Sequence, residues 1–135
     1  MKALERNQEM NIETGTIEQN PERVLHGNIF GIIQYRHQLK ALCDSLATLG
    51  VGHIKVFDGL PGIAQLEKWK EGVSEYFFGD MEGEMLQRYL DAVKNNLIVF
   101  AAPVESEMAN RAAEIAKTNG ASEVTHFGNS VITNY

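Results

Sequence analysis

Three consecutive residues, Tyr35, Arg36 and His37, carry side chains that could bind a small ligand. They stand where a strand-like apolar run gives way to a helix-like pattern, so we expect them at the N-terminus of that helix. A helix N-terminus presents free backbone N–H groups and the positive end of the helix dipole, and an arginine there could hold a phosphate or carboxylate. The sequence has neither a GxGxxG nor a Walker A motif, so an exposed first turn without a ligand is the simpler alternative.

The four histidines do not form a local metal-binding pattern. His26, His37, His53 and His126 include no His-x-His or His-x3-His pair, which a zinc site usually contains. The sequence therefore predicts no metal site within one chain, and a site shared between subunits stays open as the alternative. For His126 the expected role is that of a hydrogen-bonded strand residue.

We predict no catalytic residues and no cofactor. Asp58 and Asp80 are isolated carboxylates at turn and helix-cap positions, whereas general acid–base catalysis needs two groups within reach of one substrate. Cys43 lies among the apolar residues of a helix, which favours a small core residue over a nucleophile. Ser122 and Ser130 lack a nucleophile-elbow motif.

An aromatic cluster, Trp69, Tyr76, Phe77 and Phe78, is the most unusual local feature of the chain. At helical spacing such residues either cover a sheet face as core or anchor a partner, because Trp and Tyr are frequent hot-spot residues of interfaces. A ligand pocket is the third option.

The composition indicates a single globular domain. The chain has 135 residues, of which 44% are hydrophobic and 22% charged, which excludes wholesale disorder, collagen and coiled coil. Twelve Lys and Arg against eighteen Asp and Glu give a net charge of -6, which argues against nucleic-acid and membrane partners. A single cysteine, no signal-peptide pattern and no long apolar run together predict a cytoplasmic protein.

The hydrophobic pattern predicts two similar halves, over residues 28–57 and 97–127. Each has a continuous apolar strand, a helix that ends at a glycine (Gly50 or Gly120), and an alternating strand. Two such βαβ units interlock in the ferredoxin-like split βαβ fold. The predicted class is therefore α+β, ferredoxin-like, with a four-stranded sheet whose central strands are the first of each half and whose edge strands are the second.

Two further helices, over residues 60–78 and 81–95, are expected as a helical elaboration between the halves. The first 26 residues show no apolar face, so we predict a flexible N-terminal tail over 1–26 and a single domain over 27–135.

Several segments carry a resemblance to a known family: YLDAVKNN, LIVFAAPVE, ANRAAEI and the Asn119-Gly120-Ala121 that follows. On these segments residues 86–128 resemble the C-terminal half of small bacterial general stress proteins, also described as heat-induced stress protein domains. The first half, GIIQYRHQLKALCDSLATLGVGHIKVF, resembles the family's opening strand and helix more loosely. The resemblance implies a stress-associated role without catalytic residues. The aromatic segment replaces the family's glycine-rich central segment, and Asn95-Asn96 replace a frequent glycine.

Both central strands are apolar on both faces, so something must cover the face that the two crossover helices leave open. Either the aromatic helix or a second subunit does this. We expect a homodimer or larger homo-oligomer in which Phe30, Ile32 and Phe100 share the interface with Trp69 and Phe77.

For function, the leading expectation is a non-enzymatic, cytoplasmic, stress-associated protein that acts through oligomerisation or partner binding. The alternative is a sensor that binds a small ligand or metabolite at Tyr35–His37 or between subunits. An enzyme of unknown reaction comes third.

Overall fold

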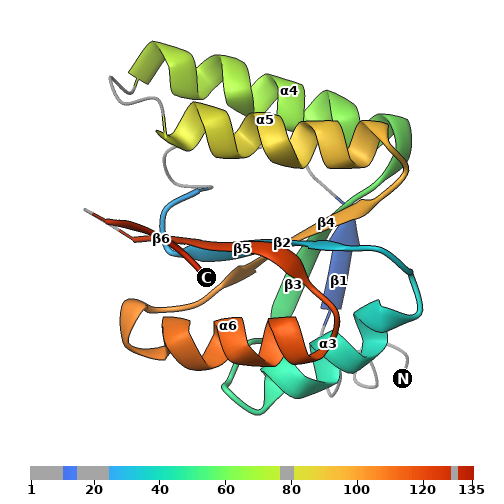
Figure 1. Ribbon diagram of the computed structural model, residues 1–135, viewed down its shortest axis with the longest axis vertical. Coiled ribbons are helices and arrows are strands. Elements are labelled where there is room, and N and C mark those ends of the chain that lie inside the picture. Colours follow the sequence, from blue (N-terminus) through green and yellow to red (C-terminus); the bar gives the residue numbers. More distant parts are fainter. Residues whose placement is uncertain (1–10, 15–24, 77–80, 129–130) are drawn as a thin grey trace, which may run out of the picture.

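Helices cover both faces of the central β-sheet, because its two middle strands are apolar on both sides. The computed structural model describes residues 11–14, 25–76, 81–128 and 131–135. The strands are β1 (Asn11–Thr14), β2 (Asn28–Ile33), β3 (His53–Phe57), β4 (Ile98–Pro103), β5 (Ser122–Phe127) and β6 (Ile132–Asn134). The helices are α3 (Gln38–Ala47), α4 (Gly59–Tyr76), α5 (Met81–Lys94), the 3-10 helix η1 (Ser106–Met108) and α6 (Ala109–Thr118). Figure 1 shows three layers, with α3 and α6 on one face of the sheet and α4 and α5 on the other.

The described strands form one sheet in the order β1-β3-β4-β2-β5-β6. β1 runs parallel to β3, and every other neighbouring pair in this order is antiparallel. It follows that β2 and β3 are parallel with β4 between them, and that β4 and β5 are parallel with β2 between them. The two predicted strand–helix–strand crossovers are therefore present, β2 and β4 are central as predicted, and the α+β class is confirmed.

The prediction of a four-stranded sheet is wrong, since six strands are described. β1 pairs with the outer side of β3 and β6 with the outer side of β5, so neither β3 nor β5 is an edge strand. β1 and the fully buried Leu25 fall within the predicted tail, and these residues belong to the folded domain instead. The rest of that prediction, over 1–10 and 15–24, lies outside the described residues. A strand of four residues is too short to show a periodic pattern, which is why the sequence did not reveal β1.

One core lies between the sheet and the helix pair α3 and α6. Both helices are amphipathic, with apolar residues three and four positions apart. The turns that follow these helices contain Gly50 and Gly120, whose φ angles of +87° and +97° confirm the predicted left-handed conformation. The buried side chains are Leu39, Leu42, Cys43 and Leu46 from α3, and Ala109, Ala112, Ala113 and Ala116 from α6.

A second core lies between the sheet and the helix pair α4 and α5, and it is rich in aromatic rings. Phe30 of β2 stacks on Tyr89 of α5, with ring centroids 5.4 Å apart. The same ring meets Trp69 and Phe127 edge-on, at 6.5 and 5.3 Å, and Trp69 meets Phe57 edge-on at 5.1 Å. These are the offset and edge-to-face arrangements that aromatic quadrupoles favour, so Trp69 of the predicted aromatic cluster is a core residue. The side chains of Tyr76, Phe77 and Phe78 lie outside the described part of the structure.

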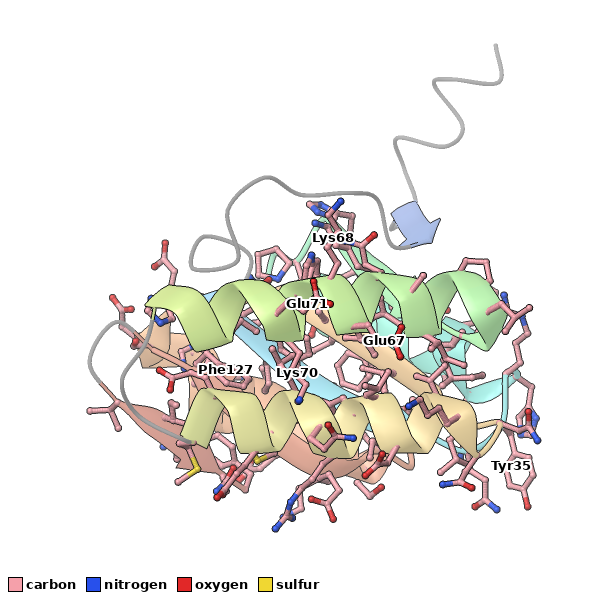
Figure 2. The ribbon with its side chains drawn as sticks, turned by 90° about the horizontal axis from the view of Figure 1, so that it is seen from above. Tyr35, Glu67, Lys68, Lys70, Glu71 and Phe127 are labelled. Carbon is pink, nitrogen blue, oxygen red and sulfur yellow. The ribbon has the colours of Figure 1, made fainter. Side chains whose placement is uncertain are left out.

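The helix pair over this second core forms one continuous cover. Figure 2 views the molecule from this side and shows α4 and α5 lying side by side across the sheet. The Lys94 ammonium lies 3.8 Å from a Glu67 carboxylate oxygen and so connects the two helices at their outer surface.

The predicted interface residues are core residues of a single chain. Phe30 and Ile32 are buried beneath α4 and α5, and Trp69 of α4 is buried against the Phe30 ring, so the chain itself covers the face that we assigned to a second subunit. The strand register places Phe100 on the opposite face, against α3 and α6. Phe77 lies outside the described residues. The apolar sheet face therefore gives no argument for a dimer.

Candidate functional site

A cavity of about 490 Å³ lies at the end of the sheet where β2 and β3 begin and β4 ends. It is lined by residues 49–52, which join α3 to β3, by residues 103–105 and Met108, which lead from β4 into α6, and by Gly27. We call it the loop pocket. Its volume falls in the range of roughly 300–1,000 Å³ that is typical of small-molecule sites.

Glycines form one side of the loop pocket. Gly50 lies in the turn after α3, where its N–H donates to the carbonyl of Ala47 at 2.9 Å, and Gly52 leads into β3. A Cβ added at Gly27, Gly50 or Gly52 would have no heavy atom within 4 Å. The backbone therefore borders open space here, which leaves room for a ligand to approach the peptide groups.

Hydrogen bonds hold the opposite wall. The Val104 N–H donates to the Gly27 carbonyl at 2.9 Å, and the Val104 carbonyl lies 2.7 Å from Nε2 of His126. A carbonyl only accepts, so Nε2 carries the proton in this contact. His126 is 4% exposed on β5, which confirms the prediction of a hydrogen-bonded strand histidine. The wall is thus connected to the start of β2 and to β5.

The lining of the loop pocket combines apolar side chains with few polar groups. Leu49, Val51, Val104 and Met108 supply the apolar surface, and Leu49 and Met108 also pack against the core beneath α3. Among the described lining residues, the charged side chain is that of the exposed Glu105. The arrangement suits a molecule with an apolar body and a neutral or cationic polar group, because an anion would meet the Glu105 carboxylate.

The predicted ligand residues, Tyr35, Arg36 and His37, lie in the exposed turn between β2 and α3, at the other end of β2 from the loop pocket. Arg36 Nη1 donates to Asp58 Oδ2 at 2.8 Å, so its charge is already compensated. The rings of Tyr35 and His37 stack with centroids 5.6 Å apart. Figure 2 shows Tyr35 at the margin of the molecule, and 52% of it is exposed.

Sequence reasoning missed the loop pocket, although a signal was present. Gly50 and Gly52 flank a single valine between a helix and a strand, and we interpreted the first glycine only as a helix cap. Two glycines so close together also indicate a loop with open backbone, which a ligand can approach.

The other candidate residues form no metal-binding cluster among the residues that the structure describes. No three His, Cys, Asp or Glu side chains of this set lie close enough to hold a metal ion. His53 and His126 sit on β3 and β5, with β4 and β2 between them. Burial raises the pKa of Cys43 to about 11, so this core thiol is protonated at neutral pH. Asp80 and Ser130 lie outside the described residues.

Comparison of the chain with family models, with curated proteins and with solved structures finds no match. Among the described helices, none is both long and apolar enough to cross a membrane.

Proposed function

We propose that the protein is a non-enzymatic domain that binds a small molecule in the loop pocket. The observation that carries this proposal is the cavity of about 490 Å³ bordered by glycine backbone, apolar side chains and one carboxylate. The proposal keeps the ligand-binding alternative of the sequence analysis and moves its site from Tyr35–His37 to the opposite end of β2. The ligand class is a molecule with an apolar body that carries a neutral or cationic polar group.

The fold proposal is a ferredoxin-like core made of β2, α3, β3, β4, α6 and β5. The order β3-β4-β2-β5 and the two parallel crossovers support it. In this description β1, β6, α4 and α5 are additions to that core. A stress-associated role and a cytoplasmic location are proposed on the family resemblance and on the single cysteine.

The ligand proposal is tested by thermal unfolding with three probes that share one apolar body: benzylamine, benzyl alcohol and benzoate. A molecule that binds the native state raises the melting temperature. At about 10 mM, benzylamine and benzyl alcohol are expected to raise it and benzoate is not, because benzoate meets the Glu105 carboxylate. The proposal is overturned if none of the three probes raises the melting temperature.

Variants locate the binding. Gly52→Phe fills the loop pocket without backbone strain, because Gly52 is not in the left-handed region, and it should abolish the shift with every probe. Gly83→Phe, at another glycine with open space beside it, is the matched control and should leave the shift in place. Glu105→Gln removes the carboxylate that excludes benzoate, so benzoate should then raise the melting temperature as well. A probe shift that survives in Gly52→Phe places binding elsewhere and overturns the site.

A further inference from the structure

A second cavity, of about 250 Å³, lies between α5 and the strands β5 and β6. It differs from the loop pocket in the charge of its lining. Glu84 and Arg88 project from α5 and Glu123 from β5, while Met81 and Met85 of α5 add apolar surface. We call it the α5 pocket.

Glu123 lies in this pocket with an unusual backbone conformation. Its φ angle is +51°, in the left-handed region that residues other than glycine rarely adopt. The position is a β-bulge. Phe30 pairs with Thr125 and Ile32 pairs with Ser122, so β5 has one more residue between these two pairs than β2 has. Glycine is the residue favoured at a left-handed bulge position. The left-handed backbone conformation disfavours a glutamate at this position. Backbone strain of this kind is concentrated at functional sites.

Neighbouring side chains hold Glu123 in place. The phenol of Tyr89 donates to the Glu123 carbonyl at 2.7 Å, and Nη1 of Arg88 donates to Glu123 Oε1 at 3.0 Å. Burial raises the pKa of Tyr89, so the phenol stays a donor at neutral pH. Two further lining residues are joined by the Thr125 hydroxyl, which donates to Asn134 Oδ1 at 2.8 Å and connects β5 to β6. The backbone of Glu123 and the pairing of β5 with β6 are thus fixed before any ligand arrives.

The charges of the α5 pocket are available to a ligand. The side chains of Arg88 and Glu123 are 61% and 43% exposed, and an ion pair so open to water is weak and can exchange partners. Glu84 lies one helical turn before Arg88 and makes no salt bridge with any residue that the structure describes. One cationic and two anionic side chains therefore line the α5 pocket together with the apolar side chains of Met81 and Met85.

We propose that the α5 pocket binds a small zwitterion, namely an α-amino acid with an apolar side chain. The Arg88 guanidinium binds its carboxylate, the carboxylates of Glu84 and Glu123 bind its ammonium group, and the two methionines contact its side chain. A ligand with only an anionic group would meet two carboxylates, and one with only a cationic group would meet Arg88. A cavity of about 250 Å³ lies just below the usual range for drug-sized ligands, which suits a molecule as small as a free amino acid.

Isothermal titration with L-leucine tests the proposal, with L-leucinamide and 4-methylpentanoate as probes that lack the carboxylate and the ammonium group. We expect L-leucine to bind and each analogue to bind at least about tenfold more weakly, because each leaves one set of charged groups unpaired. No binding of L-leucine overturns the proposal. Equal binding of L-leucinamide overturns it in favour of a site for cations alone.

Variants separate binding from folding. Arg88→Gln and Glu84→Gln should each weaken L-leucine binding at least about tenfold. Glu123→Gly removes the carboxylate and relieves the left-handed strain, so it should fold with an equal or higher melting temperature and lose binding. Two control variants should bind L-leucine like the wild type. Lys94→Gln changes a charge at the other end of α5, and Gly52→Phe fills the loop pocket and not the α5 pocket. Unchanged affinity in Arg88→Gln or Glu123→Gly overturns the assignment.

Discussion

The ring of Phe100 lies against the backbone of Gly31 on the neighbouring strand, so that a Cβ added at Gly31 would be 2.7 Å from Phe100 Cε2. The two residues are direct partners in the register of β2 and β4, and both face the core beneath α3 and α6. The backbone of Gly31 is not left-handed. This glycine is therefore required for the space that the aromatic ring occupies and not for an unusual φ angle.

Replacing Gly31 with alanine should force this ring out of place. We expect Gly31→Ala to lower the free energy of unfolding by about 1–3 kcal/mol, the usual cost of overpacking a core. Phe100→Leu in the same chain should recover part of that loss, since the smaller side chain leaves room for the methyl group. Chemical denaturation of both single variants and the double variant measures this coupling, and purely additive effects would contradict it.

The two helix-capping glycines should differ in their tolerance of a side chain. Both are left-handed, so alanine at either should cost on the order of 1 kcal/mol in backbone conformation. At Gly120 the new Cβ would also collide with the side-chain amide of Gln38, whereas at Gly50 it would meet no atom within 4 Å. Gly120→Ala should therefore destabilise more than Gly50→Ala.

The Gln38 side chain accounts for this difference and offers the control. Its Oε1 accepts the Tyr35 N–H at 3.0 Å, which holds the amide near Gly120. In a Gln38→Ala background the two glycine substitutions should have similar effects in urea denaturation. If Gly120→Ala still destabilises more than Gly50→Ala in that background, the collision with Gln38 is not the cause of the difference.

The buried thiol of Cys43 should make stability depend on pH. Burial, with a smaller effect of Asp44, raises its pKa from 9.0 to about 11 in the folded chain. Above pH 9 the unfolded chain releases this proton while the folded chain keeps it, so the free energy of unfolding falls as the pH rises. Urea denaturation between about pH 8 and 9.5 should show this fall, before Tyr89 begins to contribute near pH 10.

The variant Cys43→Ala should show a shallower decline over the same pH range. The same burial predicts that the native thiol reacts slowly with a thiol reagent at pH 8 and rapidly in urea. A thiol that is labelled at once in the native protein would show that Cys43 is accessible.

His126 should stabilise the wall of the loop pocket through the Val104 carbonyl. His126→Leu leaves this carbonyl without its donor, and a buried acceptor left unsatisfied costs about 1–3 kcal/mol. The variant should also show a smaller thermal shift with benzyl alcohol, because Val104 lines the pocket. His53→Leu, at a half-buried position on β3, is the matched control and should retain the shift. An equal decrease of the thermal shift in both variants would contradict a role of the His126 hydrogen bond in shaping the loop pocket.

Several features follow from the sequence because they depend on neighbours along the chain. The apolar runs that begin at Asn28 and Leu97 predicted two strands buried on both faces, and both are central in the sheet. Gly50 and Gly120 predicted where two helices end, since glycine adopts the left-handed conformation without a steric penalty. These properties are local, so the residue types and their spacing contain them.

Other features were decided only by the tertiary structure. The residue types along the chain predict which side chains are buried, but they do not specify the surface against which those side chains pack. The hydrophobic effect is non-directional, so the apolar side of Phe30 and Ile32 was equally consistent with a second subunit and with the chain's own helices. The face of Phe100 depends on its register against β2, which the pattern of β4 alone does not specify. The two cavities form where segments far apart in the sequence meet, and this proximity exists only in the folded chain.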